Sequence, residues 1–179
     1  MPLFSIEHSR FTYFADFVIY CACVAVLAAF LGIAAPHALR WELVAWALGG
    51  LAYWTLIEYG VHRFVLHQVP PFRAMHELHH LHPRAYIGTP TFVTLTLFVV
   101  LAFLPAWWLT NLWIASALTL GVLLGYITYS VTHHAAHHWR SSSKWMKRRK
   151  QLHGLHHQFG HSRHFGVTTS LWDHVFRSS

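Results

Sequence analysis

The sequence predicts an all-α integral membrane protein with four transmembrane helices and a cytoplasmic helical cap. Two features of the composition indicate this fold. Hydrophobic residues make up 55% of the 179 residues and charged residues only 11%, whereas a soluble domain carries roughly a quarter charged residues. The chain also contains 18 histidines, which are clustered rather than spread along the sequence.

Four stretches are long and apolar enough to cross a bilayer, which requires about 20 residues of helix. Residues 14–35, 43–66, 91–109 and 112–131 meet this requirement. Thr110 and Asn111 separate the last two, which predicts a tight helical hairpin, and Pro105 is expected to kink the third helix. Residues 67–90 and 132–179 then form the cap, so that 1–179 make a single membrane domain.

The basic residues predict the orientation of the spans. Nearly all of them lie on one side of the membrane if both termini are cytoplasmic, and only Arg40 falls on the other side, as the excess of Lys and Arg in cytoplasmic loops requires. The formal charge of +7 is therefore assigned to contact with anionic membrane lipids rather than nucleic acid. The first apolar run is too long for a cleavable signal peptide.

Histidine motifs occur four times, all on the predicted cytoplasmic side. His-x-x-His-His appears twice, and positions i, i+3 and i+4 share one face of a helix. His62 and His67 are five residues apart, which predicts a distorted or ending helix. The segment HHAAHH offers His133 with His137, or His134 with His138. The two His-x-x-His-His motifs consist of His76, His79 and His80, and of His153, His156 and His157.

These motifs contain too many imidazoles for one tetrahedral site, which uses four ligands, and they predict two metal ions with positions left open for a small molecule. Cys21 and Cys23 lie one residue apart in an apolar run, so imidazole must hold the metals. Imidazole binds zinc, copper, iron and nickel. A site beside lipid favours attack on an apolar C–H bond, which requires a redox metal and oxygen; zinc is then an adventitious occupant of the purified protein.

Five segments resemble the fatty acid hydroxylase superfamily of membrane histidine-cage di-iron oxygenases. The sequence is most similar to the fatty acid 2-hydroxylase branch, in a form without a fused cytochrome b5 domain. The segments are LIEYGVHRFVLH (Leu56–His67), MHELHH (Met75–His80), YSVTHHAAHH (Tyr129–His138), LHGLHH (Leu152–His157) and FGVTTSLWDHVF (Phe165–Phe176).

The resemblance implies two iron ions, O2 and hydroxylation of a lipid, most directly 2-hydroxylation of a free or sphingolipid-bound fatty acyl chain. It implies a separate cytochrome b5-type or ferredoxin-type electron donor, because this chain has no room for a haem domain. It also favours the register that pairs His133 with His137. The implied metal ligands are His62, His67, His76, His79, His80, His133, His137, His153, His156 and His157.

Other residues are candidates for outer partners that hydrogen-bond to the ligand rings. Glu58 lies one turn before His62 and either accepts a ring N–H, as outer partners of metal ligands do, or pairs with a basic group such as Arg63. Trp172 and Asp173 are expected to tie the C-terminal segment down beside the site. The remaining candidates are His82, His134, His138 and His161.

Alternative functions remain open at this point. Sterol or carotenoid hydroxylation and lipid desaturation start from the same hydrogen abstraction. A membrane metal-handling protein would place its ligands near the bilayer midplane, whereas these histidines begin at the membrane edge. The terminus Arg177-Ser178-Ser179 shows no endoplasmic reticulum retrieval signal, so a bacterial inner membrane is preferred over the endoplasmic reticulum.

Overall fold

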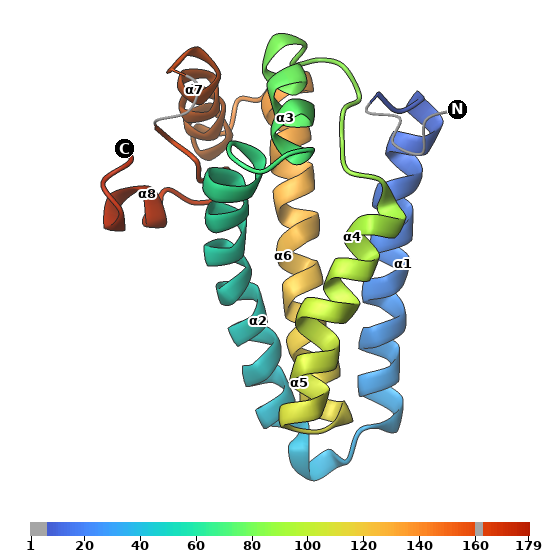
Figure 1. Cartoon of the computed structure of the whole chain (residues 1–179). Helices are drawn as coiled ribbons and strands as arrows, with labels where there is room; N and C mark the ends of the chain where they lie inside the picture. Colours follow the sequence, from blue (N-terminus) through green and yellow to red (C-terminus); the bar gives the residue numbers. More distant parts are fainter. Residues whose placement is uncertain (1–6, 160–162) are drawn as a thin grey trace. The chain divides into compact units, whose positions relative to one another are not determined.

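A computed structural model describes residues 7–159 and 163–179, and regular structure in this part of the chain is helical (Figure 1). The β structure found there is an isolated bridge between Glu7 and Ile87, so the all-α prediction is confirmed for the described residues. The helices are α1 (Arg10–Ala34), η1 (His37–Leu39), α2 (Arg40–Gly60), η2 (Val61–Leu66), α3 (Phe72–Leu81), α4 (Thr91–Phe98), η3 (Val99–Phe103), α5 (Leu104–Leu109), α6 (Leu112–His138), α7 (Lys144–Phe159) and α8 (Leu171–Val175).

Three helical stretches among the described residues are long and apolar enough to cross a membrane. They are Arg10–Ala34, Thr91–Leu109 and Leu112–His138, which indicates an integral membrane protein. The predicted second span corresponds to α2 and η2 and is not among the three, because Glu58 and several Trp, Tyr and Gly residues lower its mean hydropathy. The fourth predicted span ends at residue 131, but α6 continues to His138 since no Pro or Gly interrupts its last turns.

The chain forms two compact units. The described part of the first unit consists of residues 10–54 and 89–127, and that of the second consists of 7–9, 55–88, 128–159 and 163–179. The boundary between the units falls within α2 and within α6. All ten predicted ligands belong to the second unit, so the histidine sites can be described within it.

Helices α2 and α6 approach each other closely within the first unit. A Cβ atom at Gly50 would lie 2.3 Å from the Leu118 carbonyl oxygen, and one at Gly121 would lie 1.9 Å from that of Ala47. Only glycine fits at such distances, as is typical of helix contacts in membranes. Both helices continue beyond this contact into the second unit, where they lead to His62 and His133.

An aromatic cluster fills the interior of the first unit. The ring of Tyr126 contacts Tyr20 at a centroid distance of 4.6 Å and Trp54 at 5.4 Å, both edge to face, an arrangement that aromatic pairs favour. Phe98 contacts the same rings, and the Tyr20 hydroxyl hydrogen-bonds with Thr94. These contacts join α1, α2, α4 and α6.

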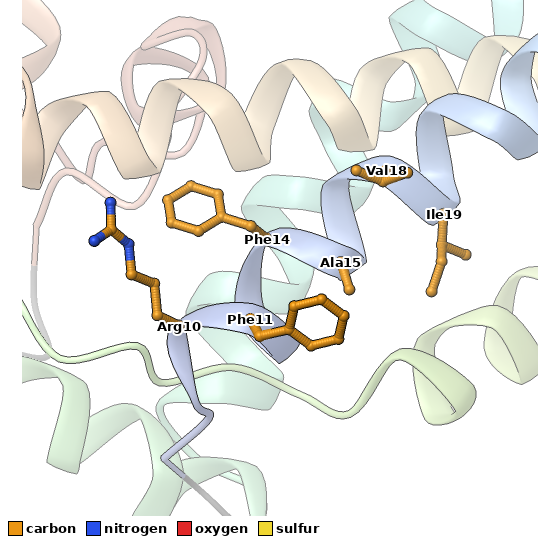
Figure 2. A pocket seen from close by; sticks show the side chains of 6 residues that line it. All are labelled: Arg10, Phe11, Phe14, Ala15, Val18 and Ile19. Atoms are coloured by element: carbon orange, nitrogen blue, oxygen red, sulfur yellow. The ribbon is translucent and has the colours of Figure 1, made fainter.

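The outer surface of the first unit is strongly apolar. Ile33 on α1 is 87% exposed and Trp108 on α5 is 86% exposed, as expected of side chains that face lipid. A hollow of about 690 Å³ lies beside the first turns of α1 (Figure 2). Its lining contains no predicted ligand and consists of Arg10, Phe11, Phe14, Ala15, Val18 and Ile19.

The hairpin between α5 and α6 follows the prediction. The π-helical turn η3 comes directly before Leu104 and Pro105, where proline cannot donate the helical hydrogen bond. The predicted kink at Pro105 stays a prediction. Asn111 begins α6 because its side-chain oxygen accepts from the backbone N–H groups of Trp113 (2.9 Å) and Ile114 (3.0 Å). This is the usual capping role of Asn.

Candidate metal centre

In the HRFVLH motif, His62 lies in a π-helical turn and His67 directly follows it. Residues Val61–Leu66 form η2, in which hydrogen bonds run from i to i+5, so residues five apart share a face. His62 and His67 are both buried, and their rings stack at a centroid distance of 5.3 Å. The distorted helix predicted from the five-residue spacing is therefore confirmed.

Helix α3 presents its three histidines to the interior of the second unit. His76 and His79 are buried and His80 is half-buried, whereas Arg73 and Glu77 form an exposed ion pair at 2.7 Å on the same helix. The alternation of apolar or imidazole positions with charged ones makes α3 amphipathic. Its histidine face therefore lies inward.

Helix α7 repeats this arrangement. His156 is fully buried and His153 is 4% exposed, while Lys147, Arg148 and Gln151 are exposed. His157 contacts histidines of both α3 and α7. Its Nε2 is 3.1 Å from Nε2 of His153 on α7, and its ring stacks on that of His80 on α3 at a centroid distance of 4.3 Å.

The end of α6 contains two separate histidine pairs. His133 and His137 approach His153, at centroid distances of 4.7 and 4.6 Å. His134 and His138 stack on each other at 4.4 Å, and His138 also stacks on Tyr86 at 5.8 Å. The structure therefore brings the first pair, which the resemblance favours, to the other histidines.

Nine of the ten predicted ligands gather in two groups, each with one nitrogen per ring within 4.8 Å of all the others. We call them the first and second histidine groups. The first consists of His62, His67, His76, His80 and His156, and the second of His79, His133, His137 and His153. The tenth, His157, contacts members of both groups, His80 and His153.

The spacing of the ring nitrogens fits metal ligation. Nε2 of His76 is 3.0 Å from that of His62 and 3.1 Å from that of His80, and Nε2 of His153 is 2.8 Å from that of His137. Two imidazoles that bind one ion at about 2.0–2.1 Å hold their nitrogens roughly 3 Å apart. Each group can therefore hold one metal ion.

Unpartnered ring nitrogens support the same interpretation. Within the described part of the chain, both ring nitrogens of His79 are buried without a hydrogen-bond partner, as are Nδ1 of His153 and Nδ1 of His157. Buried polar groups are nearly always satisfied. A metal ion would satisfy one ring nitrogen of His79, and a donor set made only of imidazole suits such an ion.

Burial keeps these imidazoles neutral. Loss of solvation, together with the neighbouring imidazoles, lowers the pKa of His79 to about 2. The pKa values of His76 and His153 are lowered far below the usual histidine range for the same two reasons. Neutral imidazole is the form that binds metal, so the groups are prepared for ligation at neutral pH.

Two backbone carbonyls orient rings of the first group. Nδ1 of His62 donates to the Phe165 carbonyl at 2.5 Å, and Nδ1 of His156 donates to the Arg163 carbonyl at 2.8 Å. A carbonyl can only accept, so each Nδ1 carries the proton and each Nε2 is free to bind a metal. The sequence did not predict these partners, because every residue carries a backbone carbonyl and its residue type does not show which carbonyl accepts a hydrogen bond.

The segment that carries these carbonyls is held by buried carboxylates. Glu58 accepts hydrogen bonds from the backbone N–H groups of Val167 (2.7 Å) and Thr168 (2.9 Å), and from the Thr168 hydroxyl at 2.5 Å. Glu58 is 3% exposed. The structure thus places this predicted outer partner against the C-terminal segment.

The predicted docking role of Trp172 and Asp173 is confirmed. Trp172 Nε1 donates to Thr55 Oγ1 at 2.9 Å. Asp173 accepts from the backbone of Phe165 and Gly166, each at 2.9 Å. His82, another predicted outer partner, is exposed at the end of α3. His161 lies outside the described residues.

Helices that can cross a membrane and two neighbouring groups of buried histidines define a class: integral membrane proteins with a candidate dinuclear metal centre. The chain belongs to the fatty acid hydroxylase family, whose family model matches residues 46–178. That range contains all ten predicted ligands.

Named relatives and a solved structure agree with this membership. The chain is 34% identical over 141 residues to a dihydroceramide fatty acyl 2-hydroxylase of Arabidopsis thaliana, covering 71% of this chain and 57% of the relative. It is 32% identical over 144 residues to the fatty acid 2-hydroxylase of Rattus norvegicus, covering 72% of this chain and 38% of the relative. The chain thus spans little more than half, or less, of these relatives.

The solved structure is described as full-length Scs7p with only the hydroxylase domain visible. Its TM-score is 0.75 at 28% sequence identity, and the match covers 91% of this chain and 66% of that one. A related sequence, the ceramide very long chain fatty acid hydroxylase of Saccharomyces cerevisiae, is 34% identical over 71% of this chain and 36% of its own length.

Proposed function

We propose that this chain is an integral membrane di-iron oxygenase that hydroxylates a fatty acyl chain, free or sphingolipid-bound, at its second carbon. The observation that supports this most strongly is the pair of neighbouring groups of buried and half-buried imidazoles inside the region that matches the family. The names of the relatives, which act on fatty acyl and ceramide substrates, support the substrate class.

The proposed ligands are the nine residues of the two histidine groups together with His157. Iron bound there would supply oxygen activation and hydrogen abstraction from an unactivated C–H bond. The chain's own residues hold the ring nitrogens about 3 Å apart, as ligation needs. The burial of His156 and His62, at 0% and 2% exposure, keeps bulk water from the first group.

The overall reaction consumes one O2 and two electrons. One oxygen atom enters the C–H bond of the acyl chain, and the other leaves as water after taking up two protons. The electrons come from a separate cytochrome b5-type or ferredoxin-type protein. Exposed Lys144, Lys147 and Arg148 on α7 form a basic surface that would suit an acidic face on the donor, or anionic lipid.

The proposed topology has four spans, with α2 as the second and both termini in the cytoplasm. The distribution of basic residues supports this orientation. We also propose that 1–179 form one hydroxylase-like membrane domain, since the family match at 46–178 includes residues of both compact units. Placement in a bacterial inner membrane stays a prediction, and the relatives named above are eukaryotic.

The test is lipid mass spectrometry of cells that express the wild type or His156→Ala under labelled oxygen, with iron and an electron donor supplied. The wild type is expected to produce acyl lipids heavier by one labelled oxygen atom at the second carbon, and His156→Ala is expected to lose them. His37→Ala serves as the matched control because His37 is exposed in η1.

Other products would decide between the remaining activities. Detection of oxygenated sterols or carotenoids would indicate that these, and not acyl lipids, are the substrate. Lipids lighter by two hydrogens would indicate desaturation. Unchanged lipids in wild-type cells with loaded iron would contradict the oxygenase proposal and favour a metal-handling protein.

A further inference from the structure

The two histidine groups differ in how their rings are held. In the first group, His62 and His156 each donate an Nδ1–H to a backbone carbonyl of the segment that follows α7. In the second group, Nδ1 of His79 and Nδ1 of His153 have no hydrogen-bond partner among the described residues. Among the described residues, the two ring N–H groups that donate to this segment therefore both belong to the first group.

Asp173 fixes the backbone that carries the Phe165 carbonyl. Its Oδ1 accepts from the Phe165 N–H, and its Oδ2 accepts from the Gly166 N–H, both at 2.9 Å. Asp173 is 1% exposed and Phe165 is 2% exposed. A Cβ atom at Gly166 would lie 2.9 Å from the Asp173 carboxylate and 2.0 Å from the Thr169 carbonyl oxygen, so only glycine permits this close approach.

The chain terminus strengthens the same attachment. The Ser178 hydroxyl donates to Asp173 Oδ1 at 2.9 Å, and the Ser178 carbonyl accepts from the His164 N–H at 2.7 Å. Asp173 and Ser178 together thus hold the backbone N–H groups of His164, Phe165 and Gly166. Hydrogen bonds to a charged group are about twice as strong as neutral ones.

Glu58 fixes the other side of the segment through Val167 and Thr168, as described above. Arg149 is a basic neighbour that interacts electrostatically with these two buried carboxylates. Arg149 is buried on α7 and donates to Ser170 Oγ at 2.8 Å. Burial lowers the pKa of Arg149, and the negative charges of Asp173 and Glu58 oppose that shift.

We infer that Asp173 and Glu58 are positioning residues for the metal of the first histidine group and not for that of the second. They hold the backbone whose carbonyls orient His62 and His156. Outer partners of metal ligands typically contribute 10–100-fold in metal affinity. The inference rests on the proposed dinuclear centre and adds an asymmetry between its two sites.

The experiment measures metal binding by the full chain in detergent, by competition with a chromogenic chelator, using Fe2+ under anaerobic conditions. Asp173→Asn keeps the side-chain shape but presents an amide N–H to one backbone donor. It is expected to weaken one of the two binding steps by about 10–100-fold and to leave the other within about twofold. Glu58→Gln is expected to weaken the same step and provides a second variant if Asp173→Asn does not fold.

Trp172→Phe is the matched control for general loosening of α8. It removes the hydrogen bond to Thr55 from the neighbouring residue but leaves the bonds of Asp173 intact. Both binding steps are expected to stay unchanged. Equal weakening of both steps by Asp173→Asn, or a similar loss in Trp172→Phe, would show a merely structural role and overturn the inference.

Combined variants assign the affected step to a group. His133→Ala removes a ligand of the second group, so adding Asp173→Asn is expected to weaken the remaining site. His67→Ala removes a ligand of the first group, so the same addition is expected to change nothing. The opposite pattern would overturn the inference. A wild-type chain that binds fewer than two metal ions would instead contradict the proposed function.

Discussion

At the scale of single residues, the site depends on imidazoles that are buried in neutral form. The sequence predicts which histidines gather but not how they divide. His76 and His80 join the first group whereas His79, on the same helical face, joins the second. Spacing along one helix predicts that the residues share a face. Which of the two groups each histidine joins depends on the neighbouring helix that its ring contacts.

The lowered pKa of the buried histidines predicts how the stability of the metal-free protein changes with pH. Burial lowers the pKa of His79 to about 2, whereas unfolded histidine titrates near 6.5. Between these values the unfolded chain binds more protons, so the free energy of unfolding falls as the pH decreases below about 6.5. Above that pH this contribution is fully present.

Thermal unfolding of the metal-free protein in detergent, followed by circular dichroism, measures this effect. We expect a lower midpoint at pH 5 than at pH 7.5. His79→Leu and other ligand-to-apolar variants should reduce the difference. A midpoint that stays constant or rises at pH 5 would mean that these histidines are accessible to solvent and already protonated.

At the scale of helices, the irregular turns were the more informative predictions. The five-residue spacing of His62 and His67 predicted a distorted helix, and the structure supplies a π-helical turn with the matching period. The predicted fourth span, 112–131, stays a prediction, and the helix that contains it runs on for about two turns to His138. Hydropathy predicts where the apolar stretch ends, but a helix can continue into polar sequence, as α6 does.

The close contact of α2 and α6 predicts a strong effect of a single methyl group. Gly121→Ala would place a Cβ atom 1.9 Å from the Ala47 carbonyl oxygen, and relief of this overlap must separate the helices. We expect a loss of about 2 kcal/mol in the free energy of unfolding, typical of overpacking.

Gly49→Ala is the matched control on the same helix pair, since a Cβ atom there meets nothing within 4 Å. It is expected to stabilise α2 by roughly 0.5 kcal/mol through reduced backbone entropy. Denaturant unfolding in detergent compares the two variants. Equal effects would show that α2 and α6 do not approach as closely as the structure indicates.

At the scale of the whole molecule, the number of spans decides where the termini lie. Three stretches satisfy length and composition, and α2 makes the proposed fourth. Four spans place both termini on the same side of the membrane, and three place them on opposite sides. Sequence could not settle α2, because residues such as Trp54 and Gly50, which contact α6, also reduce its mean hydropathy.

Reporter fusions measure the topology. A fluorescent protein that folds only in the cytoplasm is expected to be active at either terminus, and a periplasmic phosphatase reporter is expected to be inactive at both. A phosphatase inserted at His37, between α1 and α2, should be active. Opposite behaviour of the two termini would contradict the four-span topology and the cytoplasmic location of the histidines.

The central claim is that the two histidine groups each hold one iron ion. It is tested most directly by counting metal per chain in protein purified from iron-supplemented cells, with iron and protein sulfur determined together by elemental mass spectrometry. The wild type is expected to contain two metal ions per chain, and His79→Ala one. One metal ion or fewer in the fully loaded wild type would contradict the dinuclear centre.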